Sequence, residues 1–451
     1  MYSKRTGKLV LFFELFIEYN IKGDIVKVTF KRLLYIFLSV TVLTGCSCKK
    51  EEETGIIPQT KHVCEEIFGT DVSFTMYNKK ALKKVFPKVE EYLKKAYYLL
   101  DREMFYDGVI NLATINSKYG SGEEIVVDPI LYDALKLGVE LSILTDGAFN
   151  IGAGALSDIW TYYYFYDESG EYREGERFSK YGFVKEDPST SLINAALACT
   201  PTVEDYENML VFNDSNYGIT FNAIPTCSNN RDSLTLGALG KGYAIEKAKE
   251  YASTLTDEVF FINAGNSSIV TNGVNPLKER DTWNVSVQSP YPYTHGISTQ
   301  YTFNVGFADS MAISTSGDTE KYYFLDDGNE GYVLDSYGLP LKRHHIINPK
   351  TGYPENYWNV LTFYSTTRAD ILDALTTAAY SIPTIEGIES LISAIENEYN
   401  ISIDYAIQRG KKNSDTNEDY VSVWMSEHMQ DCIISQREYM ILENKKEEGV
   451  E

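Results

Sequence analysis

Residues 368–380 read RADILDALTTAAY, and this stretch predicts an amphipathic helix because it contains no Gly or Pro and repeats apolar residues at helical spacing. Asp373 and Thr377 are four residues apart, so on a helix their oxygens lie on one face. A carboxylate and a hydroxyl are hard oxygen ligands of the kind that Mg²⁺ accepts beside water and phosphate. The same residues also suit a helix without a ligand, because Asp favours a helix start and a Thr hydroxyl bonds back to a carbonyl. The pair alone leaves both interpretations open.

The residues around this stretch predict an α+β fold of helices and mainly antiparallel strands. Asp128 and Pro129 open one helix, since Asp caps a helix and Pro fits its first turn. Between Trp160 and Ser233 the chain is acidic and rich in Tyr, and we expect a long, irregular surface insertion there, at about 160–233. Helices are expected at 80–100, 129–145, 242–253 and 368–380, and strands at 63–77, 258–263, 282–288, 301–307, 312–316 and 359–365.

The composition narrows the class of protein. The chain has 451 residues, 43% of them hydrophobic, which suffices for one large domain or two moderate ones. Acidic residues outnumber basic ones by 64 to 41, so the formal net charge of -23 argues against a nucleic acid as partner. Six cysteines are too few and too scattered for a disulfide framework, and Cys64, Cys199, Cys227 and Cys432 lack the spacing of a metal site.

The N-terminal region contains the elements of a secretory signal. Lys31 and Arg32 precede an apolar run at 33–43 that is too short to span a membrane as a helix, and Leu-Thr-Gly-Cys follows, ending at Cys46. This ending resembles the bacterial lipoprotein lipobox, and the resemblance implies that Cys46 becomes the lipidated first residue of the mature chain. An ordinary signal anchor or a buried apolar segment is the alternative.

These features divide the chain into expected segments: a leader at 1–45, a polar tether at 46–60, a folded domain at 61–443 and a disordered tail at 444–451. A second apolar stretch precedes the signal, and we hypothesise that translation begins at Val26 or Val28, so that residues 1–25 are not made. The nucleotide sequence upstream of these codons tests this hypothesis, and the absence of a ribosome-binding element there contradicts it.

Several glycine-rich or polar turns punctuate the folded part. Residues 235–244 read TLGALGKGYA and run into an expected helix, where small residues and the helix N-terminus suit a phosphate and Lys241 adds a positive charge. The pattern is neither a P-loop nor GxGxxG, and tight helix–strand packing explains it equally well. The other turns lie at 146–156, 263–266 and 314–318.

A further turn at 344–352, HHIINPKTG, holds two of the five histidines. Adjacent side chains on an extended chain point to opposite faces, so at most one of these histidines enters a given site. Neither a Ser–His–Asp order nor HExxH can be built from these residues.

Taken together, the motifs GAFN, LGALGKGYA, NAGN, TSGD, HIINPKTG and DALTTA resemble those of the ApbE-type flavin transferases, in the same order and at similar spacing, over about 63–405. The resemblance implies an ApbE-type, T-fold-like α+β fold with mixed, mainly antiparallel sheets and two lobes around a flavin cleft. Members of this family are FAD:protein FMN transferases, often lipid-anchored on the outer side of the cytoplasmic membrane. They cut the FAD pyrophosphate, pass FMN to a Ser or Thr of a partner protein and release AMP.

When the motifs are matched to the family one by one, the resemblance implies a role for individual residues. His345 is the expected general base, and Lys241 stabilises the charge that develops on the pyrophosphate. A neutral imidazole near physiological pH suits the first role. The expected Mg²⁺ ligands are Ala238, Asp373 and Thr377, and the expected FAD contacts are Phe68, Tyr106, Gly147, Ala148, Phe149, Thr235, Lys241 and Ile346.

The sequence also departs from the family pattern. Thr235, Asn150 and Asn348 stand where the family usually has Asp, and Ile110 with Asn111 replaces a common Ser-Glu pair. These losses of carboxylate leave the metal pair intact but affect the adenosine side and the support of the histidine. The expected protein is therefore a Mg²⁺-dependent transferase on the extracytoplasmic face of the cell membrane, with FAD and a membrane or extracytoplasmic redox protein as partners. The alternatives are an FAD pyrophosphatase, a non-catalytic flavin-binding lipoprotein, or an interaction module built on 160–233.

Overall fold

The computed structural model describes residues 13–21, 24–32, 58–63, 67–165, 184–227, 233–265, 267–277, 282–290, 301–319, 321–329, 331–413, 415–416 and 418–443. The chain divides into two units, Met1–Gly55 and Ile56–Glu451. In the first unit β1 (Phe13–Ile21) and β2 (Asp24–Arg32) form an antiparallel pair. The apolar run at 33–43, Cys46 and the expected tail at 444–451 lie outside the described residues. None of the described helices is both long and apolar enough to cross a membrane.

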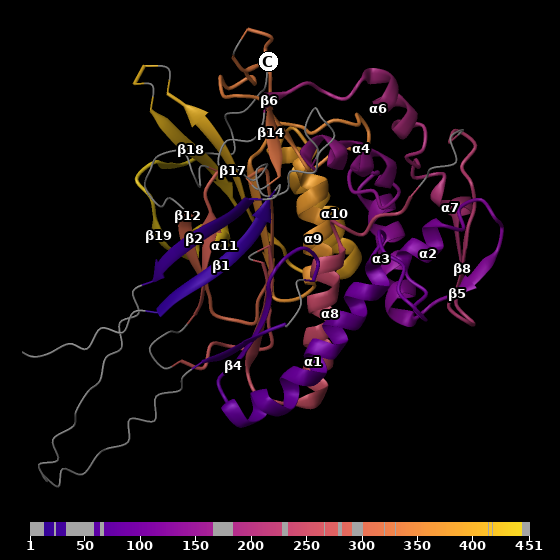
Figure 1. Cartoon of the computed structure of the whole chain (residues 1–451), viewed down its shortest axis with the longest axis horizontal. Helices are drawn as coiled ribbons and strands as arrows, with labels where there is room; N and C mark the ends of the chain where they lie inside the picture. Colours follow the sequence, from indigo (N-terminus) through magenta and orange to yellow (C-terminus); the bar gives the residue numbers. More distant parts are fainter. Residues whose placement is uncertain are drawn as a thin grey trace, which may run out of the picture. The chain divides into compact units, whose positions relative to one another are not determined.

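A nine-stranded sheet forms the centre of the second unit (Figure 1). Its neighbours are antiparallel except for one parallel pair at the edge, β18 with β20. The α+β class with mainly antiparallel strands is therefore confirmed. In spatial order the strands are β20 (Met440–Leu442), β18 (Asp419–Met425), β17 (Asp404–Lys412), β16 (Val360–Ser365), β13 (Ala312–Gly317), β10 (Ser268–Thr271), β9 (Phe260–Ala264), β4 (Val72–Met76) and β3 (Gln59–His62).

Helices cover one face of this sheet, and α8, α9 and α10 lie next to one another there (Figure 1). Alternation along β9 turns Phe260, Ile262 and Ala264 into the same apolar core as the buried stripe of the first helix. The helices of this layer are α1 (Lys79–Leu100), α8 (Gly240–Leu255) and α9 (Ala369–Tyr380) on the sheet, with α10 (Ile385–Tyr399) against α9 and α3 (Pro129–Leu144) against α1.

A smaller sheet covers part of the opposite face. It has the order β11 (Trp283–Gln288), β12 (Tyr301–Phe307) and β19 (Ile433–Gln436). Phe307 stacks on Tyr364 of the central sheet with ring centroids 3.7 Å apart, within a second apolar cluster. The central sheet is thus packed between helices and strands. A short helix, α11 (Glu427–Asp431), precedes β19.

One expected strand is shorter than the sequence suggests. The alternation at 63–77 predicts one continuous strand, whereas β4 begins only at Val72. Phe68 and Gly69 both have positive φ, 54° and 66°, and this left-handed backbone ends the extended conformation. The resulting bend is what brings Phe68 to the cleft described below.

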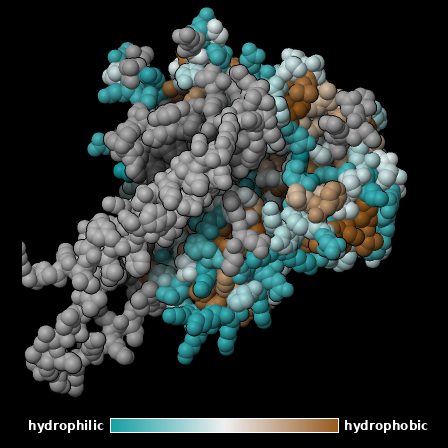
Figure 2. All heavy atoms as spheres, in the orientation of Figure 1, coloured by the Kyte–Doolittle hydropathy of each residue, from teal (hydrophilic) through white to brown (hydrophobic). Residues whose placement is uncertain are grey.

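The region expected to be irregular contains regular elements in its described parts. After α2 (Leu112–Asn116), a three-stranded sheet combines β5 (Glu124–Val126), β8 (Gly218–Phe221) and β7 (Leu210–Asn213). Helices α4 (Gly154–Phe165), α6 (Thr190–Leu197) and α7 (Tyr206–Met209) accompany it. Buried Ile219 and Phe221 join the main core, so residues 184–227 are not a purely surface loop. Figure 2 shows apolar surface over α6 and β5, where Leu192 and Val126 are exposed.

A disulfide closes this region, joining Cys199 to Cys227 across 28 residues of sequence. The two cysteines follow α6 and β8, so the bond ties the helical part to the three-stranded sheet. The small number of cysteines argues against a framework of several disulfides but leaves one disulfide possible. Their spacing along the chain does not show which two cysteines would form it. The turn at 344–352, called the histidine loop below, begins at the end of β15 (Lys342–His344), a strand of a last small sheet. This sheet also contains β14 (Tyr322–Leu325) and β6 (Val184–Lys185).

Candidate active site

The site is organised where α8 and α9 cross. A Cβ at Gly242 would lie 2.3 Å from the carbonyl oxygen of Ala369 and 2.6 Å from Cβ of Asp373, so only glycine allows this approach. The Gly242 N–H donates to Asp373 Oδ2 at 2.9 Å. The glycine-rich turn therefore does serve tight packing, as one interpretation of the sequence holds, and the same packing directs a backbone N–H at the carboxylate.

Glu246, one turn further along α8, fixes the start of α9. Its carboxylate is almost fully buried and accepts hydrogen bonds from the Ala369 N–H at 3.1 Å and the Thr367 hydroxyl at 3.2 Å. Lys249 pairs with it at 2.6 Å. Glu246 was not among the residues expected from the sequence, although its i, i+4 spacing from Gly242 places both on one face of the helix.

Asp373 is buried and held by two elements. Its Oδ1 accepts a hydrogen bond from the Ser314 hydroxyl at 3.2 Å. Its Oδ2 accepts the hydrogen bond from the Gly242 N–H of α8. Burial raises the pKa of the Asp373 carboxyl, while the charge of Lys241 and these hydrogen bonds act in the opposite direction. The carboxylate thus lies in a place where additional positive charge is favourable.

The two threonines beside it differ in position. Both hydroxyls donate back to the carbonyl of Asp373, at 3.0 Å from Thr376 and 3.3 Å from Thr377, as expected of threonine within a helix. Thr376 is fully buried and also accepts from Ser316, whereas Thr377 lines the cleft. Only Thr377 therefore presents an oxygen to a ligand.

These donors fit a hard cation such as Mg²⁺. Among the described residues no group of three His, Cys, Asp or Glu side chains forms a metal site. A Mg²⁺ ion nonetheless needs only one or two carboxylates, because it keeps several waters and takes substrate phosphate as a ligand. Asp373 and Thr377, with the backbone near Ala238, would hold such an ion, and the unfavourable burial of the carboxylate without a cation supports this fit.

A cleft of about 1360 Å³ lies beside the oxygen cluster formed by the Asp373 carboxylate and the Thr377 hydroxyl. Its volume exceeds the range of roughly 300–1,000 Å³ usual for small-molecule pockets, so it is large enough for a dinucleotide. Ten of the residues expected from the sequence line it: Phe68, Ala148, Phe149, Thr235, Ala238, Lys241, His345, Ile346, Asp373 and Thr377. The structure brings these residues together from four separate motifs and from Phe68. Lys321 also lines the cleft and was not among the expected site residues.

Gly147 and Tyr106 are not among the lining residues. Gly147 has φ of 75° and follows Asp146 at 51°, so this left-handed pair makes the turn that presents Ala148 and Phe149. Tyr106 donates to Asp101 Oδ2 at 2.6 Å, and burial and this carboxylate raise its pKa.

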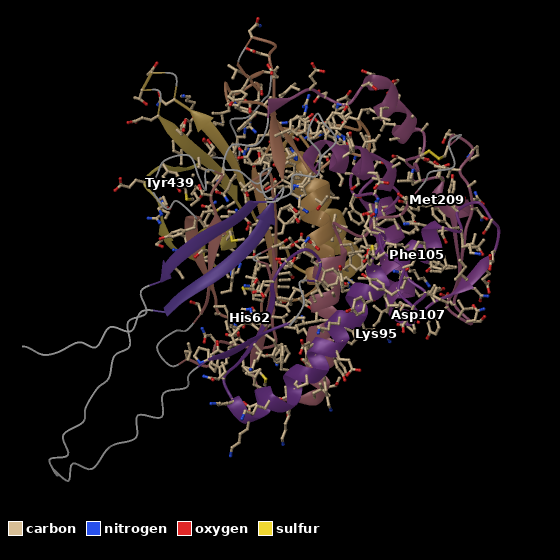
Figure 3. All side chains as sticks on the ribbon, in the orientation of Figure 1. His62, Lys95, Phe105, Asp107, Met209 and Tyr439 are labelled. Carbon is tan, nitrogen blue, oxygen red and sulfur yellow. A yellow bond between two sulfur atoms is a disulfide. The ribbon has the colours of Figure 1, made fainter. Side chains whose placement is uncertain are left out.

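Tyr106 lies at the end of an aromatic series that starts at the cleft. Its ring centroid is 4.7 Å from that of Tyr98, which neighbours Tyr97, and Tyr97 meets Phe68 edge-on at 5.4 Å. The residues on either side of Tyr106, Phe105 and Asp107, lie near Lys95 of α1 (Figure 3). Tyr106 therefore does not line the cleft itself, and a series of ring contacts connects it to Phe68, which does.

The two histidines separate as strand alternation predicts. His344 is buried, its Nε2 donates to the Glu355 carbonyl at 2.8 Å, and its Nδ1 accepts from the Ile346 N–H. His345 faces the cleft, where solvent reaches it although protein surrounds the ring. The surrounding protein and the charges of Lys321 and Lys241 lower the pKa of His345 below its ordinary value. The imidazole is neutral near pH 7 and can accept a proton.

Two of the departures from the family pattern have their own partners. The Asn150 amide donates to the Pro201 carbonyl at 2.8 Å, which an ionised carboxylate cannot do, and its oxygen accepts from Tyr206 at 2.6 Å. The Asn348 amide donates to Glu355 at 3.1 Å, so a carboxylate is still present beside the histidine loop. Both asparagines brace loops that line the cleft.

An α+β protein with a large cleft, in which cationic groups face a buried oxygen cluster, is the class that this fold and site define. A family model described as ApbE family matches residues 68–400. The chain belongs to the ApbE family.

Named relatives and solved structures agree with this assignment. A protein of Klebsiella pneumoniae named FAD:protein FMN transferase is 25% identical over 278 residues, which cover 61% of this chain and 70% of the relative. A Treponema pallidum protein of the same name is 24% identical and covers 70% and 77%. The fold is similar to the ApbE protein of Thermotoga maritima (TM-score 0.58, 22% identity, 84% of this chain and 100% of that chain). It is also similar to the apo flavinyl transferase ApbE of Pseudomonas stutzeri (0.59, 15%, 86% and 100%).

Proposed function

We propose that this protein is a Mg²⁺-dependent FAD:protein FMN transferase. One observation carries the proposal: Lys241, His345, Asp373 and Thr377 come from separate parts of the sequence and line a single cleft of dinucleotide size. Relatives that are 24–25% identical to this chain over the matched region are named for this reaction.

The residues around the cleft suggest how FAD is held. Phe68 and Phe149 offer aromatic surface for the isoalloxazine ring. The N-terminus of α8 and Lys241 offer positive charge to the pyrophosphate. Mg²⁺, when bound at Asp373 and Thr377, supplies further charge stabilisation to the phosphoryl oxygens.

His345 is placed to accept the proton of the attacking hydroxyl. The hydroxyl oxygen forms a bond to the phosphorus of the FMN moiety, the bond from that phosphorus to the bridging oxygen breaks, and AMP leaves with the bond's electron pair. Negative charge on a bound pyrophosphate opposes the effect of the two lysines and raises the pKa of His345. Substrate binding therefore makes the imidazole a stronger base.

We further propose that the protein acts outside the cytoplasm, anchored by lipid at Cys46, on a membrane or extracytoplasmic redox protein. The lipobox-like ending at Cys46 supports the anchor. The Cys199–Cys227 disulfide supports the compartment, because such bonds persist mainly in oxidising environments.

The test incubates the protein with FAD, MgCl₂ and an acceptor domain of an extracytoplasmic redox protein that exposes a Thr or Ser. Covalent FMN on the acceptor with release of AMP supports the transferase. Free FMN and AMP without modification of the acceptor indicate an FAD pyrophosphatase instead. Intact FAD that stays bound indicates a non-catalytic flavin binder.

A further inference from the structure

The charges that line the cleft are unlike those of the whole chain. The chain has 64 acidic and 41 basic residues, yet among the described residues lining the cleft the only carboxylate is Asp373. The lysines there are Lys241 and Lys321. The cleft is therefore suited to an anion, and one of its two lysines is still without a role.

The position of Lys321 follows from the pairing of β14 with β15. These strands are antiparallel with Tyr322 opposite His344, so the next pair outward is Lys321 with His345. The His345 N–H donates to the Lys321 carbonyl at 3.1 Å, which continues the ladder by one pair. Directly opposite side chains in such a ladder lie on the same face.

Alternation then separates two faces of this ribbon. His344 is buried on one face, where its ring meets that of Tyr380. Lys321 and His345 lie on the other face, and both line the cleft. The backbone register therefore directs Lys321 toward the same space as the expected general base.

Lys241 reaches this space from a different element, the first turn of α8. Beside burial, the charges of both lysines lower the pKa of His345. Two cations on separate elements that line one cleft match an extended anion such as a pyrophosphate better than a single phosphate.

We propose that Lys321 is a second phosphate-binding lysine, which contacts the FAD pyrophosphate from the β14–β15 side while Lys241 contacts it from α8. This assignment rests on the proposed function. As the bond from the FMN phosphorus to the bridging oxygen breaks, the AMP phosphate gains negative charge, and the Lys321 ammonium stabilises that charge. The hydroxyl proton goes to His345, so Lys321 keeps its own protons throughout.

The test compares the binding of FAD and riboflavin in the whole protein, measured by flavin fluorescence in the presence of MgCl₂ at several salt concentrations. Riboflavin carries the same ring without phosphate. Lys321→Gln is expected to weaken FAD binding about tenfold, reduce its salt dependence and leave riboflavin binding unchanged. Lys321→Arg is expected to restore most of the FAD affinity, because it restores the charge.

Lys136→Gln is the matched control, since the Lys136 side chain is half-exposed on α3 and pairs with Asp214 away from the cleft. The proposal is overturned if Lys321→Gln binds FAD like this control, if it weakens riboflavin equally, or if the Arg variant fails to restore binding. The proposed function has a separate outcome: if the wild-type protein binds FAD but transfers no FMN, the transferase assignment fails while the binding comparison still decides the role of Lys321.

Discussion

At the scale of single residues, the proposed chemistry depends on Asp373, the carboxylate that α9 contributes to the proposed Mg²⁺ site. Burying the charge of this carboxylate is unfavourable and raises its pKa, although a Gly N–H and a Ser hydroxyl partly compensate. Binding of a cation removes this disadvantage. Residues at functional sites often reduce stability in this way.

Replacing Asp373 by Asn should separate stability from activity. Asn keeps an acceptor for the Gly242 N–H but carries no charge, so we expect the free energy of unfolding without Mg²⁺ to rise. We expect the rate of FMN transfer to fall at least about 100-fold. Urea denaturation and the transfer assay measure the two effects.

Asp214→Asn is the control for this variant, because Asp214 is exposed and lies in an ion pair outside the cleft. It should leave both quantities nearly unchanged. Full Mg²⁺-dependent activity in Asp373→Asn would contradict the assignment of the metal site.

His344 gives a prediction for pH. Burial lowers its pKa to about 4 from an ordinary value near 6.5, so between these pH values the unfolded chain binds more protons than the folded protein. Its contribution to stability is therefore complete above pH 6.5 and is lost as the pH falls toward 4. His344→Gln should reduce the difference in unfolding free energy between pH 7.5 and pH 4.5 by about 2–3 kcal/mol. Urea titrations at the two pH values measure it, and an unchanged difference would show that His344 does not govern acid stability.

At the scale of elements, the crossing of α8 and α9 depends on one glycine. Gly242→Ala places a Cβ against backbone of α9, where neither helix can yield locally. We expect a loss of about 3 kcal/mol in unfolding free energy, together with loss of activity.

Gly237→Ala in the same turn is the comparison. A Cβ there would meet only the Thr235 hydroxyl at 3.5 Å, an ordinary contact. The expected change in stability is within about 0.5 kcal/mol. Equal effects of the two substitutions, measured by chemical denaturation, would argue against close packing at Gly242.

The helices and strands with strong periodicity could be predicted from the sequence. The alternation at 282–288 and 301–307 corresponds to β11 and β12, and the apolar stripe of RADILDALTTAAY corresponds to α9. The end of a strand at Phe68 could not be predicted, because a left-handed backbone at a non-glycine residue leaves no clear signal in one sequence.

The site residues that lie in sequence motifs could be predicted. Those that reach the site through strand pairing or through contacts between distant helices could not. Lys321 enters the cleft through its register with His345, and register follows from tertiary contacts. Glu246 acts on a helix more than a hundred residues away in sequence. The folded structure of 184–227 was hidden by the acidic, irregular composition of the surrounding region 160–233.

At the scale of the whole molecule, the disulfide stabilises the part of the chain that supports the cleft. Cys199 lies two residues before Pro201, whose carbonyl holds Asn150 beside the Ala148-Phe149 turn. Replacing both cysteines by Ser should lower the unfolding free energy by about 3 kcal/mol, as expected for a loop of this length.

Thermal denaturation with and without dithiothreitol measures this effect. The reductant should lower the melting temperature of the wild-type protein and leave the double Ser variant unchanged. Identical melting of the oxidised wild type and the double variant would mean that the bond adds no stability.

The central claim is tested most directly by the intact mass of an acceptor protein after incubation with this protein, FAD and MgCl₂. The account predicts one added FMN on a Ser or Thr of the acceptor, an equal amount of AMP, and neither product with Asp373→Asn or without Mg²⁺. An unmodified acceptor in the presence of bound, intact FAD would contradict it.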